Sequence, residues 1–444
     1  MREEEEIVYT KVLLVGLDTG EDEEFDHSIE ELKSLAEAAW KEVAGIITQR
    51  MQAVNQTFYI GTGKVEEVRE YALQCEAEEV IFDNALTPSQ MRNLGRELKL
   101  PVLDRTNLIL DIFAIRARTR EARLQVETAR LQYILPRLVG MRENLSRQGG
   151  TGGAMSNKGA GETKLELDRR KIEHRITELE RELEEVAQAR ATMRKRRNRS
   201  RIPKVALVGY TNAGKSTILN HMVAMYGERK EKSVLEKDML FATLDTNVRC
   251  IRPVKKGQAV ADNRPFFLSD TVGFIDKLPH GLVKAFRSTL EEVVYADLIV
   301  EVVDFSDEHY RQHMEVTDET LKELEAGNIP RIVVYNKADK MKMESLPRKR
   351  ERQIYMAAAS DCGMEELTEM ITDCVYADRV ERELLIPYDR GNVASYFLEN
   401  ATVLKQEYRE EGIWMRVSCG KGDADRFAAS GENRYVLGLP TAQN

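Results

Sequence analysis

The chain has 444 residues, 42% of them hydrophobic and 32% charged. This is too long for one hydrophobic core and typical of a globular protein with two to four domains. No stretch approaches eighteen uncharged apolar residues, and no apolar segment follows the acidic N-terminus, so neither a membrane span nor a secretory signal is expected. Five scattered cysteines without a Cys-x-x-Cys pair argue against a disulfide framework or a zinc site and favour a reducing, cytoplasmic compartment.

Although the formal net charge of the chain is −9, one segment is basic. Residues 116–201 contain 22 Lys and Arg against 12 Asp and Glu, so the remainder of the chain is strongly acidic. A local contact with nucleic acid and a solvated, charged helix both explain such a segment.

Residues 1–105 alternate strand and helix patterns. Apolar runs predict strands at 12–16, 45–48, 80–83 and 98–104. Ser28, with Glu31 three residues later, predicts a capped helix that continues through Trp40. This alternation predicts a small parallel sheet, and so a first α/β subdomain over 1–105. The Gly-Thr-Gly-Lys at 61–64 resembles a phosphate loop, but a tight turn before a helix explains it better.

Residues 106–200 change to a seven-residue apolar repeat with dense charge between, the coiled-coil pattern. The repeat positions are Leu124, Leu131, Leu138 and Leu145, then Leu165, Ile172, Ile176, Leu179, Leu183 and Val186. Two such runs around a glycine-rich break predict an antiparallel helical hairpin, whose first arm Pro136 interrupts. A dimeric coiled coil is the alternative; the short break favours a hairpin within one monomeric chain.

The glycine-rich break at 149–161 is either a flexible linker or a tip loop that touches another molecule. A linker inside a hairpin has no domains to connect, which favours the tip loop. The flanking basic residues predict contact with an RNA phosphate backbone; they are Arg142, Arg147, Lys158 and Lys164. The basic run 194–201 predicts a linker that adds electrostatic attraction.

The sequence Gly-Tyr-Thr-Asn-Ala-Gly-Lys-Ser at 209–216 is a phosphate-binding loop in its required context, because an apolar strand precedes it and a helix start follows it. Its glycines let backbone N–H groups turn toward phosphate oxygens. Lys215 places a charge on the β- and γ-phosphates, and the Ser216 hydroxyl binds Mg²⁺.

Three further motifs follow in the order that GTPases use. In Phe-Ala-Thr-Leu-Asp at 241–245, Thr243 can supply a hydroxyl to Mg²⁺ in a first switch. A strand then ends in Asp-Thr-Val-Gly, where Asp270 holds Mg²⁺ through water and the Gly273 N–H meets the γ-phosphate. A later strand ends in Asn-Lys-Ala-Asp at 336–339. The Asp339 carboxylate accepts two hydrogen bonds from guanine, which adenine cannot donate.

These motifs predict a catalytic set, Lys215, Thr243 and Gly273, and two Mg²⁺ ligands, Ser216 and Thr243. The predicted nucleotide-binding residues are Gly209, Tyr210, Thr211, Asn212, Ala213, Gly214, Lys215, Ser216, Thr217, Phe241, Ala242, Thr243, Leu244, Asp245, Asp270, Thr271, Val272, Gly273, Asn336, Lys337, Ala338, Asp339, Ala357, Ala358 and Ala359.

Three positions depart from small GTPases. Met-Ala-Ala-Ala-Ser at 356–360 stands where they carry Ser-Ala-Lys; Ala358 keeps a backbone contact to the base, but Ala357 lacks the hydroxyl. Phe274 replaces the glutamine that orients the attacking water in Ras-like enzymes, which predicts slow intrinsic hydrolysis. Asn212 resembles the asparagine of K⁺-dependent GTPases, which makes K⁺ a candidate second cation.

Nearly the whole chain resembles the HflX family of ribosome-associated GTPases. The matching segments outside the GTPase motifs are 80–84, 86–90, 104–114, 124–127, 135–138 and 161–170, with 385–389 and 408–412 near the C-terminus. The resemblance implies an α/β subdomain with a helical hairpin, a G domain over 201–376 with a mostly parallel sheet, and a small α+β domain over 377–444.

The resemblance also implies function. Family members bind the large ribosomal subunit in the GTP state, reach rRNA with the hairpin tip, split stalled ribosomes and are stimulated by them; some also hydrolyse ATP. The tip loop here lacks the family's arginine and proline and is a few residues longer, which leaves open either the family's usual rRNA contact or a different one, as in resistance-type relatives that relieve antibiotic arrest. Thr246-Asn247 replaces the usual Pro-Thr after the first switch.

The sequence therefore predicts a GTP-dependent ribosome-binding factor. A nucleotide-switched module acting on another RNA or protein is the alternative. A P-loop kinase or ATPase is a third, against which Asn336 and Asp339 argue.

Overall fold

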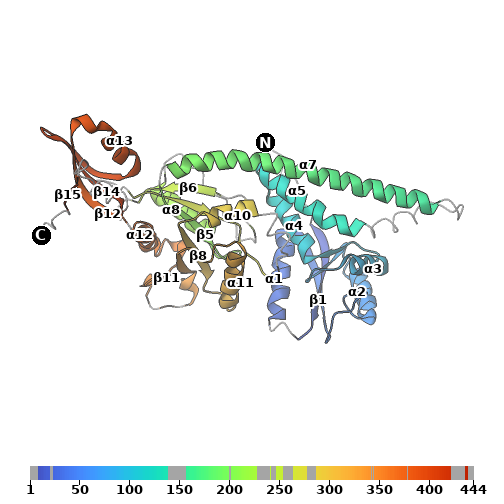
Figure 1. Cartoon of the computed structure of the whole chain (residues 1–444). Coiled ribbons are helices and arrows are strands. Elements are labelled where there is room, and N and C mark those ends of the chain that lie inside the picture. The colour runs from blue at the N-terminus through green and yellow to red at the C-terminus, as the bar shows by residue number, and fades with distance from the viewer. Residues whose placement is uncertain are drawn as a thin grey trace, which may run out of the picture. The chain divides into compact units, whose positions relative to one another are not determined.

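The computed structural model describes residues 9–20, 24–138, 157–199, 202–227, 241, 247–253, 264–277, 287–341, 343, 345–377, 379–421 and 436–438. The chain forms two compact units, shown in Figure 1. The first contains Met1–Gln188 together with Lys237–Asp245 and Ile275–Thr289, and the second contains the rest. Among the described helices, none is both long and apolar enough to cross a bilayer.

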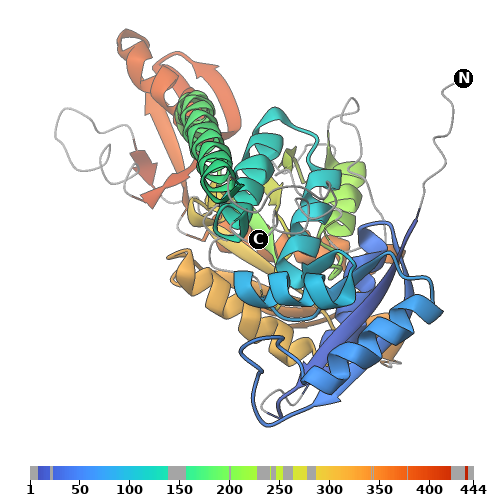
Figure 2. The same cartoon turned by 90° about the vertical axis from the view of Figure 1, so that its right-hand side faces the viewer.

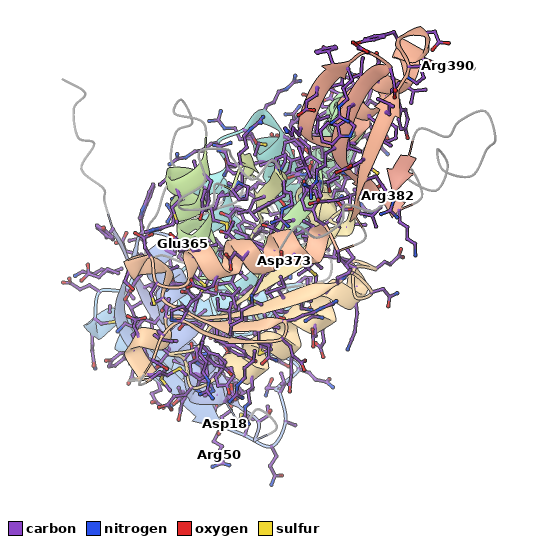
Figure 3. The ribbon with its side chains drawn as sticks, turned by 90° about the vertical axis from the view of Figure 1, so that its left-hand side faces the viewer. Asp18, Arg50, Glu365, Asp373, Arg382 and Arg390 are labelled. Carbon is purple, nitrogen blue, oxygen red and sulfur yellow. The ribbon has the colours of Figure 1, made fainter. Side chains whose placement is uncertain are left out.

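The N-terminal unit is built on a parallel sheet with the strand order β2-β1-β3-β4. Figure 2 draws its elements in blue. Its strands are β1 (Thr10–Asp18), β2 (Lys41–Arg50), β3 (Glu79–Phe82) and β4 (Val102–Asp104). Its helices are α1 (Phe25–Ala38), α2 (Thr62–Gln74), α3 (Pro88–Leu98) and α4 (Arg105–Arg116). At the ends of β1 and β2, Asp18 and Arg50 form an ion pair of 3.4 Å (Figure 3). The predicted small parallel sheet is confirmed, and Gly61 is the residue that precedes α2, as the turn interpretation requires.

The predicted cap at Ser28 is wrong, because α1 begins one turn earlier, at Phe25. The Ser28 hydroxyl instead donates to Asp83 at the end of β3, at 2.7 Å. Burial explains the difference: Ser28 is 6% exposed and faces the sheet, so its hydroxyl serves a buried carboxylate.

A buried ionic network closes this end of the sheet. Arg105, 1% exposed, donates to Asp83 at 2.8 Å and to Glu31 of α1. Lys277, from the segment that also belongs to this unit, donates to Asp83 at 3.1 Å and to Ser28 at 2.7 Å. Each carboxylate is thus matched by a cation, the condition under which buried charge is tolerated.

The helical hairpin consists of α5 (Arg120–Ile134), the 3₁₀ turn η1 (Leu135–Arg137) and α7 (Asn157–Arg199). Helix α5 stops at Ile134, so Pro136 interrupts the first arm as predicted. Ion pairs join the arms, from Arg120 to Glu182 at 2.8 Å and from Arg175 to Glu127 at 3.0 Å. The repeat residues Ile176 and Leu179 are buried, at 9% and 0% exposure.

The predicted tip loop, 149–161, lies outside the described residues except for its last five. Residues 157–161 belong to α7, so the helix begins inside the predicted loop. The i,i+4 pairs Arg169–Glu173 and Glu166–Arg170 support this arm.

The G domain contains a seven-stranded sheet with the order β10-β11-β9-β8-β5-β7-β6, antiparallel only at its two edge pairs. Its strands are β5 (Lys204–Val208), β6 (Asn247–Ile251), β7 (Phe266–Asp270), β8 (Leu298–Asp304), β9 (Arg331–Asn336), β10 (Arg348–Arg350) and β11 (Gln353–Tyr355). Its helices are α8 (Lys215–Tyr226), α10 (Arg287–Val294), α11 (Tyr310–Glu323) and α12 (Met364–Val375), with 3₁₀ turns η2 (Ala338–Met341) and η3 (Ala358–Ser360). Near-continuous burial along β5 and β8 is what a parallel sheet with both faces covered requires.

The C-terminal part forms an antiparallel sheet with the order β13-β14-β12-β15. Its strands are β12 (Arg379–Ile386), β13 (Thr402–Arg409), β14 (Gly412–Gly420) and β15 (Val436–Gly438); α13 (Gly391–Asn400) and the turn η4 (Tyr388–Arg390) complete it. Phe397 of α13 packs with Leu384 and Met415 of the sheet. The predicted fold class is thus confirmed, while the domain boundaries at 105, 200 and 376 stay predictions.

Replacing Asp83 by asparagine should lower the free energy of unfolding by about 3–5 kcal/mol, because Arg105 and Lys277 would keep their charges in a buried site without the carboxylate. Urea denaturation followed by circular dichroism measures the change. Glu173→Gln, which breaks an exposed pair on α7, is the matched control and should leave the midpoint unchanged. Equal midpoints for both variants would contradict the importance of the network.

Candidate nucleotide-binding site

The predicted phosphate loop connects β5 to α8. Two glycines make its path possible. Gly209 has φ +139° and Gly214 has φ +98°, values that side chains disfavour. A Cβ on Gly209 would lie 2.1 Å from the Val302 carbonyl oxygen, and one on Gly214 would lie 2.2 Å from Asn336 Nδ2. The loop is therefore pressed against β8 and β9, and neither position has room for a side chain.

Lys215 opens α8 with its ammonium group buried, at 6% exposure. The Nζ donates to the carbonyl oxygens of Gly209 at 2.9 Å and Tyr210 at 2.7 Å. Burial lowers the pKa of Lys215 to about 8, which attraction to Asp270 only partly offsets. The loop thus holds a desolvated cation between two carbonyl groups.

Ser216 and Asp270 form the candidate magnesium site. The Ser216 hydroxyl donates to Asp270 Oδ2 at 2.7 Å, where α8 begins and β7 ends. Asp270 is fully buried. Hydroxyl and carboxylate oxygens are ligands that Mg²⁺ prefers, so this pair fits the ion. The buried Thr211 hydroxyl has no hydrogen-bond partner within the described part of the chain, as expected of a group beside an oxygen-rich ligand.

The segment after Asp270 runs along the phosphate loop. The Thr211 N–H donates to the Phe274 carbonyl at 2.8 Å, and the Phe274 N–H donates to the Gly209 carbonyl at 3.1 Å. A Cβ on Gly273 would lie 3.1 Å from Lys215 Nζ, so Gly273 directly borders the ammonium group. Asp270–Gly273 and the loop therefore form one site, as the motif order predicts.

Asn336 joins this site to the candidate base-binding loops. Its Nδ2 donates to the Ala213 carbonyl at 2.9 Å, and its Oδ1 accepts from the Ala358 N–H at 2.9 Å. Next to it, Lys337 forms an ion pair of 2.7 Å with Asp304 at the end of β8.

The remaining base-site residues differ in exposure. Asp339 is exposed in η2, with its carboxylate accessible to a ligand. Ala357 and Ala358 are buried, whereas Ala359 is exposed. The Ala358 N–H is already donated to Asn336, so its backbone contact to the base stays a prediction, which this geometry does not support.

Some predicted residues are not placed with this site. Phe241 is buried in the N-terminal unit, edge-on to Phe113 with ring centroids 4.8 Å apart. Ala242, Thr243, Leu244 and Asp245 lie outside the described residues, as do Arg142 and Arg147. Lys158 and Lys164 lie in α7, but their side chains are not among those described.

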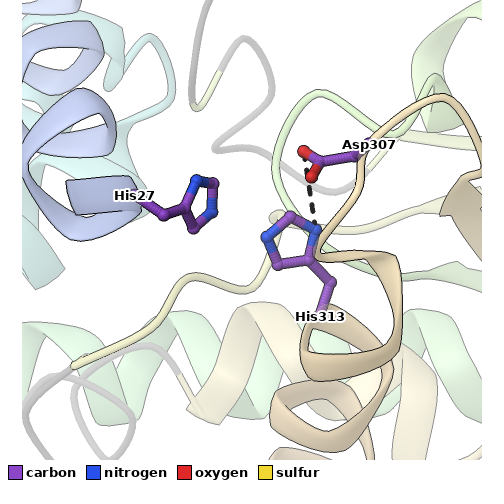
Figure 4. Close-up of side chains that lie close together, drawn as sticks. All are labelled: His27, Asp307 and His313. Carbon is purple, nitrogen blue, oxygen red and sulfur yellow. Dashed lines mark ion pairs between the residues drawn. The ribbon is translucent and has the colours of Figure 1, made fainter. Parts of the chain in front are cut away.

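The motifs did not point to a buried stack beside the loop. The Tyr210 ring lies parallel to the His313 imidazole, with centroids 3.8 Å apart and planes 12° apart. Asp307 lies 3.9 Å from His313 Nδ1 (Figure 4). A histidine 103 positions from its partner tyrosine gives no sequence signal, because only the fold brings α11 to the phosphate loop.

Strand, phosphate loop, helix, Asp-x-x-Gly and Asn-Lys-x-Asp on one mostly parallel sheet define a P-loop GTPase. Three family models match the chain: "GTP-binding GTPase N-terminal" over 26–114, "GTP-binding GTPase Middle Region" over 116–197 and "50S ribosome-binding GTPase" over 204–337. The chain belongs to the HflX family of GTPases and is a GTP-hydrolysing enzyme.

Two relatives illustrate the similarity. The GTPase HflX of Caldanaerobacter subterraneus is 42% identical over 92% of this chain and 91% of its own. The GTPase HflX of Escherichia coli is 36% identical over 86% and 87%. Among solved structures, a GTP-binding protein from Sulfolobus solfataricus in complex with GDP is 25% identical, with a TM-score of 0.43 over 83% of this chain and 99% of that one.

The buried ammonium group makes nucleotide affinity depend on pH. Charged Lys215 attracts phosphate and the neutral amine does not, so affinity is present below pH 8 and is lost as the pH rises through that value. Between pH 7.5 and 8.5 the Kd for GDP should rise about threefold. Isothermal titration calorimetry measures this Kd. The Lys215→Ala variant should bind GDP weakly, with a Kd that does not change over the same pH interval. A parent Kd that stays constant over the interval would contradict the assignment.

Proposed function

We propose that this GTPase binds the large ribosomal subunit in its GTP state and splits or rescues stalled ribosomes, as part of a response to stress or to antibiotics. Its membership of a family with a ribosome-binding G domain supports the proposal. The observation that carries it is α7, a helix of 43 residues whose first turns contain the basic tip-flanking Lys158 and Lys164. A helix of this length separates its first turn from its last by about 60 Å, and the basic residues of its first turns suit contact with an RNA backbone. The protein acts in the cytoplasm, as a monomer.

In this proposal, GTP and GDP occupy the loops that Asn336 holds together. The phosphates lie over residues 209–217 with Lys215 beside them, and Asp339 selects guanine. Ser216 and Thr243 would hold Mg²⁺, and Asp270 would support it through water; when bound, the ion would supply positive charge to the β- and γ-phosphates. The Gly273 N–H donates to the γ-phosphate. ATP is a second candidate substrate.

Intrinsic hydrolysis is slow in this proposal. Phe274 is 3% exposed, and both its N–H and its carbonyl are bonded to the phosphate loop. A buried phenyl ring cannot orient water as glutamine does. Either the ribosome or a K⁺ ion held by Asn212, whose φ is +59°, would complete the site.

Guanine selection by Asp339 can be tested by replacing its carboxylate with an amide of the same shape. In Asp339→Asn the amide offers a donor where the carboxylate accepts, which matches xanthine better than guanine. GDP affinity should fall about five- to 150-fold and XDP affinity should rise, since a mismatched polar pair costs about 1–3 kcal/mol. Competition binding of both nucleotides measures this. An unchanged preference for GDP would contradict the base-site assignment.

Ribosome engagement is tested by co-sedimentation with subunits, with GDP or a non-hydrolysable GTP analogue. Pelleting with the large subunit should require the analogue. The same result for both nucleotides, or no pelleting, would favour the alternative of a nucleotide-switched module that acts on another RNA or protein.

The role of the tip is tested by deleting 149–156, which leaves α7 intact. The deletion should abolish ribosome splitting without changing the Kd for GDP. Glu173→Gln, on the exposed part of the same arm, is the control and should split ribosomes normally. Loss of GDP binding in the deletion would show that this segment is structural.

A further inference from the structure

The stack of Tyr210 on His313 ties the phosphate loop to helix α11. Both residues are 7% exposed, so the contact is almost dry. Parallel rings at a centroid distance of 3.8 Å touch over their faces. Tyr210 lies within the phosphate loop, whereas His313 belongs to a helix that contributes none of the nucleotide motifs.

The backbone around Tyr210 contacts both the Lys215 ammonium group and Phe274. Its carbonyl oxygen accepts the 2.7 Å hydrogen bond from Lys215 Nζ. The residues on either side, Gly209 and Thr211, make the two backbone hydrogen bonds to Phe274. The orientation of this one residue therefore affects both the Lys215 ammonium group and the segment that follows Gly273.

The Tyr210 side chain holds the backbone in this orientation, because the preceding residue, Gly209, has no side chain that could do so. His313 is held firmly in turn. Its carbonyl accepts the Thr317 hydroxyl at 2.8 Å one turn further along α11, and Leu321 buries the same helix face. Asp307 accepts the His309 N–H at 2.9 Å where α11 begins, and approaches His313 Nδ1. Helix α11 thus holds the imidazole in place, and the Tyr210 ring packs on it.

We propose that His313 is a positioning residue of the GTPase site. By stacking on Tyr210 it holds the phosphate loop in its binding shape before nucleotide arrives, and so spares the nucleotide the cost of ordering that loop. The flat ring carries this role, and the charge of the imidazole does not. His313 never touches the nucleotide.

The proposal predicts that affinity changes while turnover does not. In His313→Ala the loop must be ordered on binding, so the Kd for GDP and the KM for GTP should both rise about two- to tenfold, the range expected for loss of one aromatic contact. The kcat should stay within twofold, because the bound loop has the same shape. His313→Phe keeps a flat ring without the nitrogens and should restore both values.

Three further variants isolate the contribution of the stacked rings. Asp307→Asn still accepts the His309 N–H but lacks the charge, and it should bind GDP like the parent. His174→Ala removes an exposed histidine from α7 and controls for the substitution itself. Tyr210→Ala combined with His313→Ala should weaken GDP binding no more than Tyr210→Ala alone, as expected for two residues that act through one contact.

The measurements are fluorescent GDP titration, steady-state GTP hydrolysis and thermal melting of each variant. His313→Ala with a lower melting temperature but a parental Kd and KM would show a purely structural residue and overturn the proposal. So would failure of a folded His313→Phe to restore affinity, or an Asp307→Asn variant that loses as much affinity as His313→Ala. A lower kcat at unchanged KM would also overturn it.

Discussion

The nucleotide site depends on the side chain of Asn336. This amide donates to the carbonyl of Ala213 and accepts from the N–H of Ala358, so it joins the phosphate loop to the loop after β11. It is 3% exposed, and a buried amide that lost either partner would leave a polar group unsatisfied. Gly214 is glycine because Asn336 fills the space that its Cβ would need. The distance between the phosphate-binding and base-binding ends of the site is therefore fixed by this one side chain.

The phosphate loop holds a cation, the Lys215 ammonium group, whose charge the protein does not neutralise completely. Lys215 is desolvated and bonded to two carbonyl oxygens, which are weaker partners for an ammonium group than a phosphate would be. Holding the ammonium group in this way lowers the stability of the free protein. A bound anion offsets that loss. Two neighbouring groups border the loop: Asp270 accepts the Ser216 hydroxyl, and Gly273 approaches Lys215 without a side chain.

The sequence predicted those parts of the molecule that local chemistry determines. Apolar runs marked β1, β5 and β9, and the glycines at 209 and 214 marked a loop that only glycine allows. At Ser28 and His313, tertiary contacts that no local pattern encodes decided the outcome. Ser28 looked like a helix cap but bonds a buried carboxylate 55 residues away. Asn157–Gly161 looked like loop but joins the long helix of the hairpin. His313 carried no local signal, because its function depends on a tyrosine that only the folded sheet brings within reach.

The position of Phe274 bears on when hydrolysis occurs. Its backbone closes two hydrogen bonds to the phosphate loop on either side of Tyr210, so moving it to admit a polar group would disturb the carbonyl that Lys215 uses. A group that orients water would then have to approach from outside this segment. If the ribosome supplied that group, as the proposed function has it, hydrolysis would follow engagement and would not precede it. The proposed role of His313 fits that order: a loop that is already shaped would bind nucleotide readily, and the chemical step would wait until the arm has met its target.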